Sequence, residues 1–201
     1  MAANVLGAVV LVLAVAVTLP QFTRTVIRGG TAGLSFVSLG NTTVSSTAWC
    51  VYAVLEGDFW LLVTSLVYAL GFGAVTVAYV ARTRQPAGWR WVAGWLLFVS
   101  VAIAGSVTDV FPLGLSVAVV VGAVAWGAPQ VVKVWRSDSV TGVSVTSWVM
   151  ILIDASLWGV YATLSDLPAL AVWAILAVTS AVAVLSRVAV LKKHGVAAAS
   201  V

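Results

Sequence analysis

Long apolar stretches, separated only by short polar breaks, run through almost the whole of this 201-residue chain. Hydrophobic residues make up 62% of the sequence and charged residues only 8%, whereas a soluble domain usually carries about 25% charged residues. Because so few charges cannot solvate a globular surface, we expect lipid to surround most of the chain. A helix that crosses a bilayer needs about 20 apolar residues, so the sequence predicts an all-α membrane protein with about seven crossings.

The breaks between the apolar stretches contain glycine, proline and charged residues, as in Glu56-Gly57-Asp58. They separate seven expected spans, at about residues 4–23, 34–55, 59–81, 91–110, 112–132, 143–164 and 167–188. We expect the first stretch to remain as a span and not to be cleaved as a signal peptide, because it lacks a basic start and is followed by arginines.

The basic residues predict the orientation of these spans. All ten Lys and Arg residues fall on one side of a seven-span chain: Arg24, Arg28, Arg82, Arg84, Arg90, Lys133, Arg136, Arg187, Lys192 and Lys193. Because Lys and Arg gather in cytoplasmic loops, we expect an outside N-terminus and a cytoplasmic C-terminus in the cell (plasma) membrane. The clustering also explains the net charge of +4 without a nucleic-acid partner.

A sequence repeat relates the first three expected spans to the last three. Pro20-Gln21 and Pro129-Gln130 lie 109 residues apart, and this shift keeps register without a gap over residues 20–55. The other informative matches are Gly33, Ser35, Trp49 and Tyr52 with Gly142, Ser144, Trp158 and Tyr161.

The shift leaves the fourth span alone. A three-helix unit begins and ends on opposite faces of the membrane, so a second copy in the same orientation needs one extra crossing. We therefore predict a 3+1+3 arrangement of two parallel repeats. It consists of a first repeat (1–86), a linker helix (87–111), a second repeat (112–190) and a cytoplasmic tail (191–201).

Pro-Gln near the end of the first helix, Gly-x-Ser before the second and Trp-x-x-Tyr near its outer end resemble the PQ-loop superfamily. The 3+1+3 layout is similar to the SWEET sugar-transporter branch, and each half resembles a bacterial SemiSWEET protomer. The resemblance implies alternating access around a mono- or disaccharide held near the midplane between the repeats. It assigns the hinges to Pro20 and Pro129, each with its glutamine, and sugar stacking to Trp49 and Trp158.

The third helix of each repeat departs from the family pattern, in which an asparagine usually faces the sugar. The corresponding residues are Ser65, beside Thr64, and Ala174, beside Trp173. The remaining polar candidates for contact with the substrate are therefore Ser65, Thr64 and Asn41, which is a polar residue of the second span.

Each of the other candidate residues has a structural alternative. A proline inside a helix removes a backbone hydrogen bond and bends the helix, so each Pro-Gln pair is either a hinge or a static kink. Trp49 and Trp158 are either walls of a pocket or anchors at the membrane interface. Tyr52 and Tyr161 share the helix face of these tryptophans and either add hydroxyl groups to a pocket or only pack.

Asp154 is the one carboxylate placed well inside an expected span, and it lies one helical turn before Trp158. An ionisable residue at this depth is costly and is often functional. Three roles stay open: an acceptor for a sugar hydroxyl, an acid that couples transport to protons, or a structural acid bonded to a neighbouring Ser or Thr. For Gly71 and Gly73 we expect a role in close helix packing.

The sequence contains no constellation typical of an enzyme, a metal site or a bound cofactor. The function that we predict is passive uniport of a sugar. One alternative is a proton-coupled carrier of an amino acid or another small metabolite that uses Asp154, and another is a non-transporting membrane receptor or scaffold. The expected partners are a small-molecule substrate and the lipid bilayer, with a homo-oligomer left open.

Overall fold

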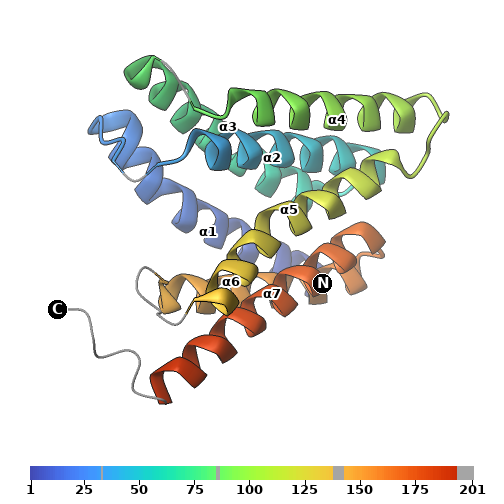
Figure 1. Cartoon of the computed structure of the whole chain (residues 1–201). Coiled ribbons are helices and arrows are strands. Elements are labelled where there is room, and N and C mark those ends of the chain that lie inside the picture. Colours follow the sequence, from blue (N-terminus) through green and yellow to red (C-terminus); the bar gives the residue numbers. More distant parts are fainter. Residues whose placement is uncertain (33, 85–86, 138–142, 194–201) are drawn as a thin grey trace. The chain divides into compact units, whose positions relative to one another are not determined.

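The computed structural model describes residues 1–32, 34–84, 87–137 and 143–193. These residues form seven α-helices, a π-helical turn and no β-strand, which confirms the expected all-α class (Figure 1). The elements are α1 (Ala2–Phe22), η1 (Thr23–Ile27), α2 (Phe36–Glu56), α3 (Phe59–Thr83), α4 (Trp89–Val107), α5 (Gly114–Arg136), α6 (Val145–Leu164) and α7 (Pro168–Lys193). Gly33, Gly142 and the predicted tail beyond residue 193 lie outside the described residues.

Six of the described helices are long and apolar enough to cross a membrane, and the first of them runs through α1 and η1 together. The helix α2 is not among the six, although it has 21 residues. Six polar residues lie within positions 41–47 of this helix: Asn41, Thr42, Thr43, Ser45, Ser46 and Thr47. Two of the threonine hydroxyls donate to the carbonyl four residues earlier, from Thr43 to Leu39 and from Thr47 to Thr43, at 2.9 Å each. Such bonds reduce the cost of these side chains in lipid, but membrane crossing by α2 stays a prediction.

The helix ends differ by a few residues from those expected. The fourth helix ends at Val107 and not at residue 110, and α5 begins at Gly114 and not at 112. The basic ends extend further than expected, since α5 continues to Arg136 and α7 to Lys193. Long basic side chains let an apolar helix continue into the interface while their charges reach water. They also stabilise the carboxyl end of a helix dipole.

Serine residues of the two Gly-x-Ser motifs begin α2 and α6. The side chain of Ser35 accepts a hydrogen bond from the backbone N–H of Ser38 at 3.4 Å. In the same way Ser144 accepts from the N–H of Ser147 at 3.2 Å. Serine is favoured at this position because the first N–H groups of a helix have no carbonyl partner. The motif therefore supplies the same helix start twice.

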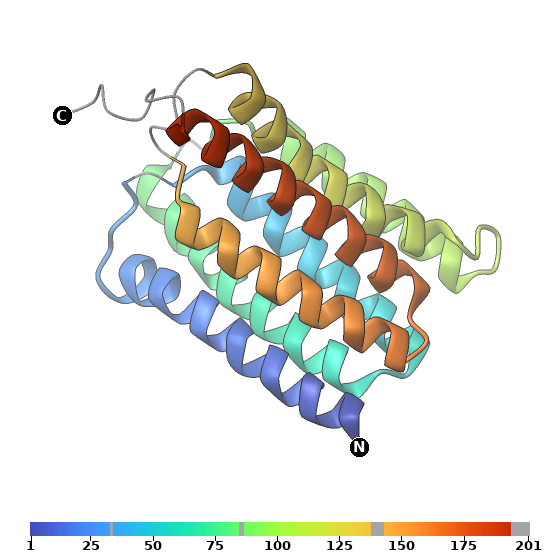
Figure 2. The ribbon, with the colours of Figure 1, turned by 90° about the horizontal axis from the view of Figure 1, so that it is seen from below.

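The chain divides into two compact units, one from Met1 to Val119 and the other from Val120 onwards. In the first unit α3 packs against both α1 and α2, and α4 packs against α2 (Figure 1). In the second unit α6 and α7 pack side by side (Figure 2). A buried apolar cluster joins the three helices of this unit: Val134 of α5, Trp148 of α6, and Ala181, Val184 and Val188 of α7. The division into residues 1–86, 87–111 and 112–190 stays a prediction.

Candidate functional site

Each unit contains a tryptophan packed edge-on against the tyrosine three residues later. In α2 the ring centroids of Trp49 and Tyr52 are 5.4 Å apart at an interplanar angle of 86°. In α6 those of Trp158 and Tyr161 are 5.5 Å apart at 88°. Perpendicular rings are favourable because the positive edge of one ring meets the negative face of the other. Each tyrosine ring therefore holds its indole in the same orientation in both units.

The two pairs differ in the exposure of the indole. Tyr52 and Tyr161 are both buried, with 2% of their surface exposed. Trp158 is also buried, at 4% exposed, whereas Trp49 is only half-buried. The two tyrosines are therefore packed equally well in both units, whereas the indole of Trp49 has more exposed surface than that of Trp158.

The turn that follows each Trp–Tyr pair has the same backbone conformation, although its sequence differs. Gly57 has φ +68° and Asp166, 109 residues later, has φ +54°. The next residues, Asp58 and Leu167, each donate their N–H to a carbonyl five residues earlier, at 2.9 Å in both turns. These left-handed residues with a six-to-one hydrogen bond close α2 and α6 in the same way. Comparison of the sequence with itself missed this equivalence because glycine and aspartate do not match.

Pro20 lies in the last turn of α1, and the helix changes its hydrogen bonding directly after it. Residues Thr23–Ile27 form a π-helical turn, which the N–H of Arg28 closes by donating to Thr23 O at 3.0 Å. Gln21 Nε2 donates to Thr25 Oγ1 at 3.1 Å, and Thr25 is fully buried. Single π turns are frequent at functional sites because they break the regular ladder of the helix. The first Pro-Gln pair therefore stands at an irregular helix end.

The second Pro-Gln pair has a different local structure. Pro129 lies inside α5, which continues to Arg136, and both Pro129 and Gln130 are exposed. Val134 occupies the position of Thr25 and packs into the apolar cluster of the second unit with 3% of its surface exposed. Valine has no acceptor atom on its side chain, so Gln130 cannot form the bond that Gln21 makes.

A close helix crossing lies two residues before each proline. A Cβ atom at Gly71 of α3 would collide with Thr18 Cγ2 of α1. In the second unit a Cβ atom at Gly127 of α5 would lie only 2.7 Å from Ser180 Oγ of α7. Thr18 corresponds to Gly127 and Gly71 to Ser180, so the glycine and the hydroxyl residue have exchanged helices between the units.

The packing role expected of Gly71 is thus confirmed, while that of Gly73 is wrong. The nearest atom to a Cβ at Gly73 would be Thr43 Cγ2 at 3.7 Å, which is an ordinary contact. The two glycines are neighbours on α3 but point in different directions, and only one of them faces α1.

Thr64 and Ser65 are buried in α3, at 1% and 4% exposed. Among the described residues, Thr64 Oγ1 has no hydrogen-bond partner. Their counterparts in α7 are the half-buried Trp173 and the buried Ala174. Ala174 Cβ lies 3.4 Å from the position that a Cβ on Gly159 would occupy, so this residue serves the packing of α7 against α6. The hydroxyl groups of Thr64 and Ser65 in α3 therefore have no counterpart at the equivalent positions of α7.

Asp154 is half-buried in α6, one turn before Trp158. Its Oδ1 atom is shielded and has no hydrogen-bond partner within the described part of the chain. The corresponding residue of the first unit, Ser45, accepts a hydrogen bond from Trp95 Nε1 of α4 at 3.2 Å. The structural-acid role, in which Ser or Thr would satisfy the carboxylate, is not observed for this oxygen. Binding a solute hydroxyl and holding a proton are the roles that this oxygen can still perform.

Sequence reasoning missed three polar contacts between helices of the first unit. Besides the bond from Trp95, Trp60 Nε1 donates to Asn4 Oδ1 at 3.0 Å and joins α3 to α1. The hydroxyls of Thr43 and Thr76 lie 3.0 Å apart and join α2 to α3. Asn41, the predicted polar candidate, is half-buried in α2. No sequence signal identifies such pairs, because they depend on which helices are neighbours.

Residues 2–62 match the family model of the PQ loop repeat. The matched PQ-loop repeat includes Pro20-Gln21, the capping Ser35 and the Trp49–Tyr52 pair, and it ends within α3. The first part of the chain is therefore similar to one PQ-loop repeat, and the six membrane-length helices in the described ranges indicate a multi-pass membrane protein. A comparison with curated protein sequences found no match.

Proposed function

We propose that this chain is a SWEET-like transporter that carries a mono- or disaccharide down its gradient by alternating access. The observation that carries the proposal is the recurrence of the Trp–Tyr pair with the same ring geometry in both units. An indole offers a π face to sugar C–H groups and an N–H to a hydroxyl, which suits a neutral polar solute. In this proposal the basic residues face the cytoplasm of the cell, and the N-terminus is outside.

The close crossings restrict where the helices can bend. Thr18 with Gly71, and Gly127 with Ser180, hold the segment before each proline tightly against the neighbouring helix. Each proline lies two residues after such a crossing. It has no backbone N–H, so the helix lacks one of the hydrogen bonds that would resist bending at this point. Movement is therefore directed to the segment after the proline, which in the first unit contains the π turn and the Gln21–Thr25 bond. Such hinged half-helices open and close solute pathways in transporters.

The missing family asparagines are replaced by other polar atoms in this proposal. Thr64 Oγ1 and Asp154 Oδ1 are shielded and have no partner among the described residues, so each has an unused hydrogen-bonding capacity. A buried polar atom without a partner is costly, and a solute hydroxyl would remove that cost. Ser65 and Asn41 are the further candidates for this contact.

Uptake by purified protein in proteoliposomes tests the proposal, with radiolabelled glucose and sucrose offered with and without a pH gradient. We expect uptake of at least one sugar, at a rate independent of the gradient, that falls at least tenfold in Trp49→Ala/Trp158→Ala. The matched control is Trp91→Ala, which removes an indole that is 78% exposed on α4 and should leave uptake unchanged. No flux of any solute, with capture of a specific partner, would contradict transport and indicate the receptor.

The shielded Oδ1 atom of Asp154 also supports a second candidate, a proton-coupled carrier of an amino acid or another small metabolite. Carboxyl groups inside membrane helices commonly relay protons. In that case solute would accumulate only with a pH gradient, and Asp154→Asn would abolish the accumulation while leaving exchange between equal pools. Asp166→Asn, at an exposed turn, is the control. Under sugar uniport, Asp154→Asn would instead weaken apparent sugar affinity without any gradient dependence.

A further inference from the structure

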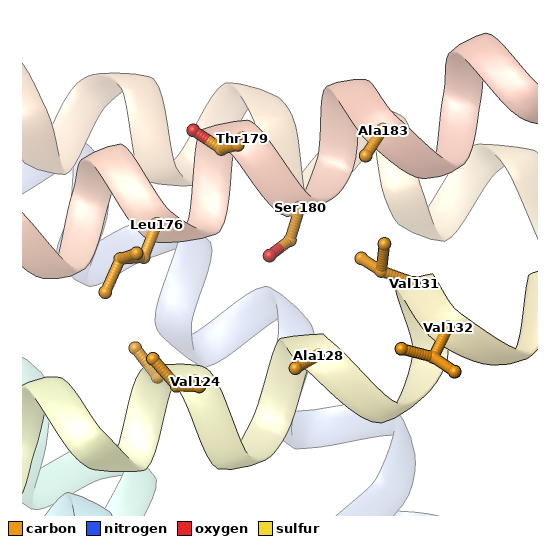
Figure 3. Close-up of a pocket in the computed structure, with 9 residues that line it drawn as sticks. Val124, Ala128, Val131, Val132, Leu176, Thr179, Ser180 and Ala183 are labelled. Carbon is orange, nitrogen blue, oxygen red and sulfur yellow. The ribbon is translucent and has the colours of Figure 1, made fainter. Parts of the chain in front are cut away.

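We propose that the second unit binds an anionic phospholipid of the surrounding bilayer, with one acyl chain in a groove between α5 and α7 and the headgroup at the basic end of this groove. The α5–α7 groove is lined by residues within 123–132 of α5 and 176–183 of α7, and it has a volume of about 230 Å³ (Figure 3). This inference does not depend on the solute that the protein carries.

The lining of the α5–α7 groove is apolar except for Thr179 and Ser180. Figure 3 shows the Ser180 side chain directed toward α5, where it meets the backbone at Gly127. Pockets for polar small molecules usually exceed about 300 Å³ and combine several convergent polar groups. The smaller and almost wholly apolar α5–α7 groove suits a hydrocarbon chain better than a sugar.

The residues at the rim of the groove face the medium around the helices. Val124 and Val132 line the groove and are 48% and 46% exposed. Both α5 and α7 are long and apolar enough to cross a membrane. At membrane depth the exposed face of such helices meets lipid, so acyl chains are the molecules available to enter.

Several side chains that line the α5–α7 groove are shorter than their counterparts in the first repeat. Three lining residues, Ala128, Val131 and Thr179, stand where the first repeat has Leu19, Phe22 and Leu70 at a distance of 109 positions. Each of the first-repeat residues is larger than its counterpart. At two other lining positions the second repeat has the larger residue, Leu176 against Val67 and Ser180 against Gly71, so the lining as a whole differs between the repeats.

Basic and aromatic residues continue the two walls of the groove beyond its apolar part. Trp135 and Arg136 follow Val132 by three and four positions on α5, and Arg187 follows Ala183 by four positions on α7, so they share the helix faces of the groove. Trp135 Nε1 donates to Ala183 O at 3.1 Å, and the Arg187 guanidinium carbon lies 5.9 Å from the centroid of the Trp135 ring.

The charge at this end fits the headgroup of an anionic lipid. Arg136 and Lys133 are exposed in the last turn of α5, and Arg187 Nη2 donates to Ser137 O at 3.2 Å. Guanidinium groups form charge-assisted hydrogen bonds with phosphate oxygens, and basic pockets between membrane helices commonly bind such headgroups. The first repeat has Arg24 at the position of Lys133, but it has Val26, Ile27 and Ala78 at the positions of Trp135, Arg136 and Arg187, so three of these four residues have no equivalent there.

Native mass spectrometry of the full chain tests the inference, after reconstitution in vesicles with equal amounts of phosphatidylglycerol and phosphatidylcholine. We expect one retained lipid per chain, with phosphatidylglycerol preferred at least fivefold. Ala128→Leu/Thr179→Leu, which introduces the first-repeat residues, should remove the retained lipid. Lys133→Gln/Arg136→Gln should keep a lipid but reduce the preference to about one.

Matched controls are Ala93→Leu and Arg90→Gln, which change an exposed alanine and an exposed arginine of α4 and should leave both readouts unchanged. If the double variant does not fold, Ala128→Leu alone fills less of the groove and should still reduce the amount of retained lipid at least twofold. Equal retention of the two lipids by the unchanged protein, or undiminished retention in the filled variants, would overturn the proposal. A filled variant that dissociates a dimer without losing lipid would also overturn it and would assign the groove to a second copy of the chain.

Discussion

Individual side chains at the ends of the helices determine where several of them begin. Asp58 precedes α3, and its Oδ1 atom accepts a hydrogen bond from the N–H of Leu61 at 2.7 Å. Ser35 and Ser144 do the same for α2 and α6. These three residues could be identified from the sequence as parts of polar breaks, since a short polar residue before an apolar run is typical of a helix start. Their hydrogen bonds are visible only in the structure.

Asp58→Ala is expected to lower the stability of the folded protein by about 1 kcal/mol, because it leaves the N–H groups of the first turn of α3 without an acceptor. The measurement is the melting temperature in a single detergent, compared with the unchanged protein. Glu56→Ala, at an exposed acid of the same break that caps no helix, should melt like the unchanged protein. Equal melting temperatures for both variants would mean that Asp58 does not act as a cap.

At the level of helices, the apolar runs were sufficient to predict the number and order of the elements but not their contacts. The packing of α3 against both α1 and α2 brings Thr18 to Gly71, and no pattern in the sequence predicts that pair. The two Pro-Gln pairs match in sequence and differ in structure, because the buried residue four positions after each glutamine is Thr25 in one unit and Val134 in the other. The 109-residue shift therefore predicts where the second Pro-Gln pair lies in its helix, but not whether its glutamine forms the same hydrogen bond.

The exchange of glycine and hydroxyl residue leads to a prediction for the crossing of α1 and α3. Gly71→Ser should destabilise the protein by about 1–3 kcal/mol, because the added side chain collides with Thr18. Combining it with Thr18→Gly reproduces the arrangement of the second unit and should restore most of the lost stability. Melting temperatures of the two single variants and the double variant measure the coupling.

Gly73→Ser is the control for this cycle, since the position has only ordinary contacts. It should lower the melting temperature much less than Gly71→Ser. Additive effects of Thr18→Gly and Gly71→Ser would contradict a direct contact between the two residues.

Across the whole chain, the two units share local geometry and differ in the groups that surround it. The Trp–Tyr pairs and the turns after them agree closely, whereas the hydroxyls of α3, the shielded carboxylate of α6 and the α5–α7 groove each belong to one unit. The sequence predicted the recurrence of the Trp–Tyr pairs because identical residues stand at one interval, but it missed the turns because Gly57 and Asp166 differ. It also identified Thr64 and Asp154 as candidates, but it could not predict that their oxygen atoms are shielded or that α5 and α7 form a groove, because both depend on three-dimensional neighbours.

Pro20→Ala/Pro129→Ala is expected to reduce sugar flux at least tenfold while the protein still inserts and melts cooperatively. Alanine restores the backbone donor, so each helix resists bending at that point. Proteoliposome uptake measures the flux, and insertion is checked by the yield of membrane-extracted protein. Pro168→Ala is the matched control, because a proline at the first residue of α7 removes no helical hydrogen bond. Unimpaired flux in the double variant would show that the prolines are static kinks.

The exchanged crossing residues also restrict the order in which substitutions can have occurred. Changing the pair Thr18 and Gly71 into the pair found at Gly127 and Ser180 takes two replacements, and the intermediate carries either two hydroxyl residues or two glycines. Two hydroxyl residues collide across a close helix contact, whereas two glycines leave a small gap whose cost is limited by the atoms removed. A change from one pair to the other by successive single substitutions is therefore tolerated in one order only. The hydroxyl residue of the first helix must be replaced by glycine before the glycine of the second helix is replaced by a hydroxyl residue.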